Sequence, residues 1–128
     1  MASILKVDDL RGNTAAGNIT ITSEGGSATM QLQQGVAKTW SNVSSSQAIN
    51  DSLNLSSITD TATGNHDLNW TNSFSNSNYS STGADGLYGN FNAEPHTLST
   101  GEANVYTYNN SFALADASFA HVAHGDLA

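Results

Sequence analysis

Residues 49–70, with the sequence INDSLNLSSITDTATGNHDLNW, decide the fold that we expect for this chain. One polar residue separates Leu53 from Leu55, and one separates Leu68 from Trp70. Such alternation places apolar side chains on one face of a strand and polar side chains on the other. The segment between the two runs is rich in Asp, Thr, Gly and Asn, which favour turns. The stretch therefore predicts two strands of a half-buried antiparallel sheet, with all four apolar side chains facing inward.

The composition indicates an all-β protein with a thin core. The chain has 128 residues, the length of one ordinary domain, and only 38% of them are hydrophobic. Charged residues make up 11%, whereas disordered chains usually carry many charges. We therefore predict an all-β fold, with a short extended N-terminal arm followed by a small antiparallel β-sandwich-like knob. Because one chain supplies few large apolar residues, we expect neighbouring subunits of an oligomer to help close its core.

A Ser-rich connection at residues 41–47 is the best internal boundary. It divides the chain into an N-terminal attachment arm, residues 1–46, and a C-terminal knob domain, residues 47–128. Within the arm, two β-branched or alternating runs at 18–22 and 28–32 predict short strands.

In the knob, a long loop-like segment follows at residues 71–89. Residues 104–108 and 111–114 predict a strand pair. The final run, 118–124, is apolar or aromatic on both faces, so we expect it to lie centrally in a sheet or at a subunit interface.

The charge is distributed unevenly along the chain. The three cations are Lys6, Arg11 and Lys38, whereas eight of the eleven acidic residues follow Lys38, and the net charge is −8. Since no basic patch can form after Lys38, the sequence argues against nucleic-acid binding. No apolar run is long enough to span a membrane, and charges at Lys6, Asp8 and Asp9 interrupt the start before a signal peptide could form. We expect no membrane insertion, and the absence of cysteine excludes disulfides and thiol chemistry.

The sequence contains none of the common catalytic motifs. There is no Gly-x-Ser-x-Gly elbow, no His-Glu-x-x-His pair and no glycine-rich phosphate loop. We therefore expect a protein that is not an enzyme.

The most suggestive candidates for metal ligands are His121, His124 and Asp126. Positions three apart on a strand face opposite sides, so one chain cannot bind a metal ion through both histidines. Copies of one residue could meet only around a symmetry axis. Residues 60–65 faintly resemble an acidic calcium loop but lack its ligand spacing, which favours a plain turn. We therefore predict no metal ion and no cofactor.

Aromatic residues between positions 74 and 91 leave two alternatives open. Tyr79 and Tyr88 could stack on sugar rings, which would make them glycan-binding residues. Alternatively, Trp70, Phe74, Tyr79 and Phe91 are the large core residues of an Ala-rich domain.

Several blocks of the sequence carry a family resemblance through the order in which they occur. The blocks are Ser3–Asp8 with Leu10 and Arg11, Ala15–Ile21, Leu32–Trp40, Asn50–Asp60 with Gly64 and Trp70, and Gly125–Ala128. In this order they resemble small fibre or appendage structural proteins of tailed bacteriophages, particularly phages of marine bacteria.

The resemblance implies a non-enzymatic virion structural protein, a short homotrimeric fibre or a decoration appendage on the capsid or tail. The arm would dock on a capsid or tail protein through Ile4, Leu5, Val7, Leu10 and Arg11. The knob would be the distal end, where it could take part in host attachment. Such a protein would be made in the host cytoplasm and found in the virion. The alternative, from another class, is a carbohydrate-binding adhesin module that recognises host surface glycans.

Overall fold

A computed structural model describes residues 4–15, 19–23, 25–85 and 92–128. The chain is all-β and its sheets are antiparallel, which confirms the predicted fold class. It divides into two compact units, Met1–Val36 and Ala37–Ala128. In the part of the chain that the structure describes, no helix is long and apolar enough to cross a membrane.

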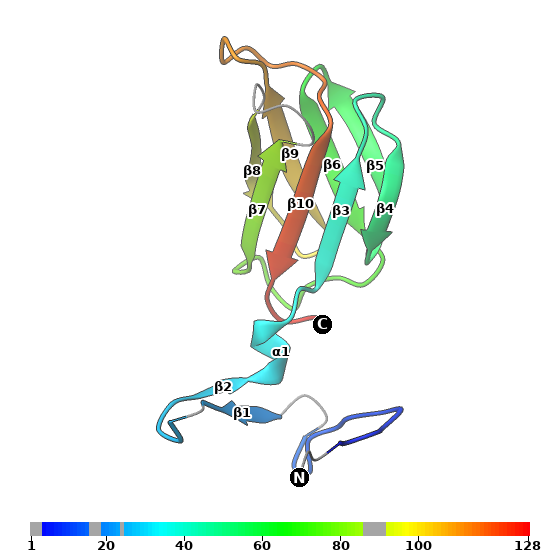
Figure 1. The fold of residues 1–128 in the computed structure, drawn as a ribbon. Coiled ribbons are helices and arrows are strands. Elements are labelled where there is room, and N and C mark those ends of the chain that lie inside the picture. The colour runs from blue at the N-terminus through cyan, green and yellow to red at the C-terminus, as the bar shows by residue number, and fades with distance from the viewer. Residues whose placement is uncertain (1–3, 16–18, 24, 86–91) are drawn as a thin grey trace. The chain divides into compact units, whose positions relative to one another are not determined.

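Figure 1 labels the helix and the strands of the described residues. They are β1 (Thr20–Thr22), β2 (Thr29–Gln31), α1 (Leu32–Gly35), β3 (Thr39–Val43), β4 (Ile49–Leu53), β5 (Leu55–Ala62), β6 (Asn65–Trp70), β7 (Ser80–Asp85), β8 (Asn92–Leu98), β9 (Glu102–Tyr108) and β10 (Phe119–His124).

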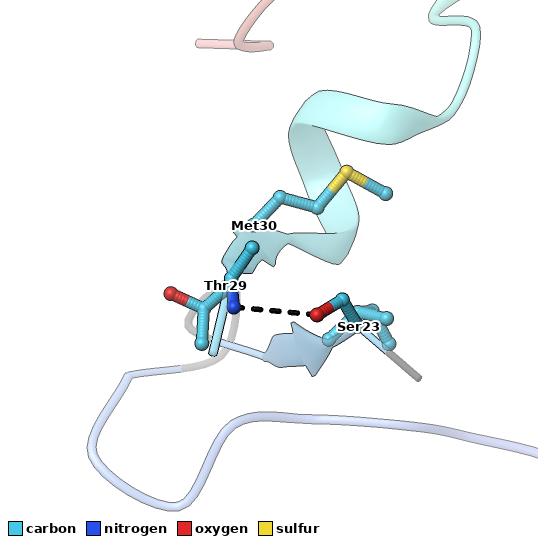
Figure 2. A pocket seen from close by; sticks show the side chains of 5 residues that line it. Ser23, Thr29 and Met30 are labelled. Atoms are coloured by element: carbon cyan, nitrogen blue, oxygen red, sulfur yellow. Dashed lines mark hydrogen bonds between the residues drawn. The ribbon is translucent and has the colours of Figure 1, made fainter. Parts of the chain in front are cut away.

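The first unit contains a β1–β2 hairpin followed by the single helical turn α1. The two strands lie at the predicted positions and pair antiparallel, with Ile21 opposite Met30. Both side chains are exposed, and none of the described residues between 4 and 36 is buried. An open pocket on this hairpin is shown in Figure 2, lined by Ile21, Ser23, Ala28, Thr29 and Met30. The unit therefore has strands but no core of its own.

The second unit is a sandwich of two four-stranded antiparallel sheets (Figure 1). One sheet has the strand order β4-β3-β10-β7, and the other has the order β5-β6-β9-β8. Alternate residues of β6, β9 and β10 are buried, as expected for sheets with one face on a core and one face on solvent. The predicted final strand is β10, which lies between β3 and β7 and confirms the central position expected for it.

The core closes within a single chain. Leu68, Val105 and Phe119, from three strands of both sheets, have no solvent exposure. Trp70 is 7% exposed and packs edge-on against Phe74. The sandwich thus buries these core side chains without a neighbouring subunit, whereas the composition predicts that subunits help to close the core.

The inward prediction holds for three of the four apolar residues of the opening stretch and is wrong for Leu53. Leu55 and Leu68 are buried, but Leu53 is 47% exposed. The cause is Asn54, whose φ of 60° lies in the left-handed region that Asn tolerates better than most residues. Asn54 lies between β4 and β5, which belong to different sheets, so the alternation does not continue across it. The Asn54 side chain fixes the corner, because its Oδ1 accepts the Asn72 N–H at 2.7 Å.

The division between the units lies ten residues before the predicted boundary at 46/47. Strand β3 pairs with β10 over five residues, so it belongs to the sandwich that begins at Ala37. Residues 41–43 of the Ser-rich connection belong to β3. The remaining residues form the β3–β4 turn, in which Ser44 N–H donates to Ala48 O at 2.9 Å. Turns within a domain and linkers between domains share this polar composition. The Ser-rich stretch alone therefore does not distinguish one from the other.

Two local predictions of secondary structure are wrong. Residues 111–114 form a turn with a single bridge between Tyr108 and Leu114, because Asn109 Oδ1 accepts the N–H groups of Ser111 and Ala113. The predicted loop at 71–89 contains strand β7, which pairs with β10 in register from Ser80.

Candidate functional site

The predicted docking side chains of the arm are accessible. Ile4, Leu5, Val7 and Leu10 are between 50% and 78% exposed. Arg11 Nε contacts Asp9 Oδ2 at 2.5 Å, an ion pair on the surface that contributes little stability. Four apolar side chains within seven residues are thus free to contact another molecule.

A second apolar surface lies on the outer face of the β4-β3-β10-β7 sheet. Leu53, Trp40 and Val122 stand side by side on β4, β3 and β10, since the register pairs Leu53 with Trp40 and Trp40 with Val122. Leu53 is 47% exposed and Trp40 is 37% exposed. We call these three residues the apolar stripe. An apolar row across three strands is the kind of surface that a partner covers.

Tyr79 lies in the core, so the core alternative applies to it. It is 7% exposed, and its ring stacks on Phe74 with a centroid separation of 3.9 Å. The phenol donates to the carbonyls of Ser99 and Glu102, at 3.1 and 2.9 Å, and burial raises its pKa. A buried ring cannot stack on a sugar, which removes Tyr79 as a glycan-binding residue. The other candidate, Tyr88, lies outside the described residues.

The predicted metal candidates do not converge. His121 is buried, whereas His124 is half-buried on the opposite face of β10, as the strand period predicts. Asp126 interacts electrostatically with Lys38 instead: burial lowers the pKa of Lys38, and the Asp126 carboxylate opposes this effect.

His121 and Ser81 form a partly buried hydrogen bond that resembles a base and nucleophile pair. Ser81 Oγ lies 2.7 Å from His121 Nε2, and the His121 ring stacks on Trp70. Burial lowers the pKa of His121 to about 4, so the ring is neutral at pH 7. With His121 only 3% exposed and no hydrogen-bond partner on its Nδ1, the pair has neither access for a substrate nor an orienting carboxylate. We interpret it as part of the core.

Three other side chains do come together at one end of the sandwich. Asp60 on β5 stands directly opposite His66 on β6, and Asp116 reaches them from the segment before β10. One ligand atom from each residue lies within 4.8 Å of the other two. His66 is fully buried, and both carboxylates are exposed. We call these residues the Asp–His–Asp cluster.

Sequence reasoning missed this cluster. The only local signal in the sequence is that Asp60 and His66 lie on either side of a turn. Asp116 is distant in the sequence, 52 residues after its hydrogen-bond partner Gly64.

Comparisons of the chain with models of protein families, with curated proteins and with solved structures found no match.

Proposed function

We propose that the chain is a non-enzymatic structural protein of a bacteriophage virion. It forms a short homotrimeric fibre or decoration appendage on the capsid or tail, with the N-terminal unit as the docking segment and the sandwich as the distal knob. The phage assignment rests on the resemblance of the ordered sequence blocks. The assignment of docking to the N-terminal unit is supported by its exposed apolar side chains.

One observation carries the docking part of the proposal. None of the described residues between 4 and 36 is buried, although Ile4, Leu5, Ile21 and Met30 are all apolar and at least 41% exposed. A two-stranded hairpin alone is marginally stable in water. A segment with this composition gains order by covering its apolar side chains on a partner, and a particle protein is the partner that we propose.

The apolar stripe supports the homotrimer. Because the sandwich closes its own core, subunits would associate through outer surfaces, and the stripe of Leu53, Trp40 and Val122 presents apolar area for such a contact. The occupant that we propose for it is a second copy of the chain. Of the two residues predicted to bind glycans, Tyr79 is buried and Tyr88 lies outside the described residues, so neither supports the carbohydrate-binding alternative.

Particle incorporation tests the docking. Virions of a phage that encodes the chain are assembled with the wild-type protein or with the variant Ile4→Ser/Leu5→Ser, and the protein is located by immunogold electron microscopy. We expect label on wild-type particles and loss of label with the variant. The matched control is Phe112→Ser, which removes a side chain that is 78% exposed on the sandwich. Equal labelling of particles with all three proteins would contradict docking through the arm.

The mass in solution tests the trimer. We expect three times the mass of the 13.3 kDa chain at micromolar concentration, and a shift toward the monomer for Trp40→Ser/Leu53→Ser. Phe112→Ser serves again as control, because it removes an apolar side chain that is 78% exposed and lies outside the stripe. A wild-type protein that stays monomeric would count against the homotrimer.

A further inference from the structure

The Asp–His–Asp cluster brings three potential metal ligands together. Contacts with neighbouring residues fix the positions of His66 and Asp116. The His66 ring is fully buried and stacks on Phe119, with centroids 5.7 Å apart and planes inclined by 15°. Asp116 Oδ1 accepts the Gly64 N–H at 2.6 Å, which ties the segment before β10 to the β5–β6 turn. Asp60 is the adaptable member, with a side chain that is 53% exposed.

The backbone of Gly64 packs closely against the segment that carries Asp116. Its φ is 67°, and a Cβ there would lie 2.6 Å from both Ala115 N and Thr107 O. The Thr107 N–H also donates to Gly64 O at 2.9 Å. The turn and the segment that carries Asp116 are therefore held against each other by backbone contacts.

The hydrogen bonds of Thr107 fix which nitrogen of His66 carries the proton. Thr107 Oγ1 has one hydrogen, and it donates this hydrogen to Ala115 O at 2.7 Å. Toward His66 Nε2, 3.2 Å away, the hydroxyl can only accept, so Nε2 is the protonated nitrogen. In a neutral imidazole, Nδ1 then carries a lone pair.

That lone pair is buried and has no hydrogen-bond donor. Nδ1 of His66 has no hydrogen-bond partner, and Asp60 Oδ1 lies 3.9 Å from it. A buried acceptor without a partner is unfavourable, because it has lost its hydrogen bonds to water without replacement, and carboxylates nearby add repulsion. A proton or a cation on Nδ1 would relieve this cost. Burial lowers the pKa of His66, while the charges of Asp116, Asp60 and Asp67 oppose this effect.

We propose that Asp60, His66 and Asp116 bind a divalent first-row transition-metal ion, such as Zn²⁺, through His66 Nδ1 and one oxygen of each carboxylate. Imidazole nitrogen suits Zn²⁺ and its neighbours better than Mg²⁺ or Ca²⁺. Zinc bonds to N and O measure about 2.0–2.2 Å. The exposed Asp60 side chain can rotate to bring its carboxylate, now 3.9 Å from His66 Nδ1, to a position that suits such bonds. The Nε2–H to Thr107 contact has the form that orients metal-bound histidines.

A metal ion in this position would cross-link distant parts of the sandwich. It would join β5 and β6 of one sheet to the segment that leads into β10 of the other. No Lys or Arg follows Lys38 in the sequence, so this end of the domain has no cationic side chain from residues 39–128 to neutralise its carboxylates. The expected consequence is a higher unfolding temperature in the presence of the ion.

Calorimetric titration of the full chain with Zn²⁺, after treatment with a chelator, tests the site. We expect one ion per chain and an affinity at least tenfold lower for Asp60→Asn and for Asp116→Asn. Asn at position 116 keeps an oxygen for the Gly64 N–H, so the fold is preserved, and circular dichroism checks this. The controls are Asp51→Asn, which removes the same charge from β4, and His96→Gln/His124→Gln, which removes surface histidines. Absence of Zn²⁺ binding, or equal binding by the wild type and the Asp60→Asn/Asp116→Asn double variant, would overturn the proposal.

Nitrogen NMR of the imidazole of His66 gives a second readout that does not depend on affinity. Without metal at neutral pH we expect the Nε2–H tautomer, and addition of Zn²⁺ should shift the Nδ1 resonance selectively. Magnesium, added as a comparison, should leave that resonance unchanged. A His66 ring protonated on both nitrogens at neutral pH would show that a proton already satisfies Nδ1, which contradicts the metal site.

Discussion

The two compact units of this chain differ in the property that folding most requires, the burial of apolar side chains. In the sandwich, Leu68, Val105 and Phe119 are fully buried between two sheets. In the N-terminal unit none of the described residues is buried, although it has its share of Ile, Leu, Val and Met. Burial of apolar surface is the main favourable term in folding. The comparison therefore teaches that the sandwich has a core of its own, whereas the described part of the N-terminal unit has none.

The largest expected effect lies inside the sandwich, where two leucines of the opening stretch form a matched pair. Leu68→Ala removes a fully buried side chain and should lower the free energy of unfolding by about 2–5 kcal/mol. Leu53→Ala removes one that is 47% exposed and should cost less than about 1 kcal/mol. Urea denaturation of both variants measures the difference. Equal losses of unfolding free energy in the two variants would mean that Leu53 contributes as much to stability as a core residue does.

Acid should weaken the sandwich through His121. Its pKa is lowered to about 4 in the folded state by burial, against 6.5 for the ordinary group. Between these values the unfolded chain binds the proton and the folded chain does not. The contribution of His121 is therefore complete above pH 6.5 and is lost as the pH falls toward 4, by about 3 kcal/mol in all.

Urea denaturation at pH 7 and pH 4 checks this sign and size. In His121→Gln the difference between the two pH values should shrink by about 3 kcal/mol, while the exposed His96→Gln should retain the wild-type difference. An unchanged pH dependence in His121→Gln would show that the histidine is not buried as described.

Substitution of one glycine with positive φ in each unit compares how the two units contribute to stability. Gly64→Ala, with φ of 67° and a Cβ that would meet two backbone atoms at 2.6 Å, should cost the sandwich about 2 kcal/mol or more. Gly26→Ala, with φ of 71° and nothing within 4 Å, lies in the N-terminal unit and should leave the unfolding of the sandwich unchanged. Thermal unfolding followed by circular dichroism measures both. A similar loss for the two variants would mean that the units unfold together.

How far the sequence predicts this fold depends on whether a feature is local. The alternation in β6 and β10 predicts which residues face inward, because the strand period of two is a local property. The position of Leu53 was not predictable from that period, since Asn54 takes a left-handed conformation that depends on its bonds to Asn72. The Ser-rich turn between β3 and β4 reads as a linker because the partner of β3, strand β10, lies far along the chain.

The candidate site was less predictable than the fold for the same reason. Asp60 and His66 are visible in the sequence on either side of a turn. Asp116 joins them through its hydrogen bond with the N–H of Gly64, which lies 52 residues earlier in the chain. Conversely, the strand period correctly predicts that His121 and His124 cannot share an ion within one chain. Tyr79 carried no sequence signal that separates a core ring from a surface ring.

The smallest expected effect is the removal of the whole N-terminal unit. A chain that begins at Ala37 keeps every strand of both sandwich sheets. Its free energy of unfolding should differ from that of the full chain by less than about 0.5 kcal/mol, the range for changes outside packed regions. Urea denaturation of the shortened and full chains makes the comparison. A loss of several kcal/mol would show that the sandwich requires the N-terminal unit.

Amide hydrogen exchange of the full chain, followed by mass spectrometry, tests the contrast between the units most directly. The account predicts slow exchange in β6, β9 and β10, whose amides open only with the sandwich. It predicts fast exchange throughout the described residues from 4 to 36, including β1 and β2, when no particle protein is present. Protection of β1 and β2 comparable to that of β10 in the isolated chain would contradict the proposal that the N-terminal unit gains its order on a partner.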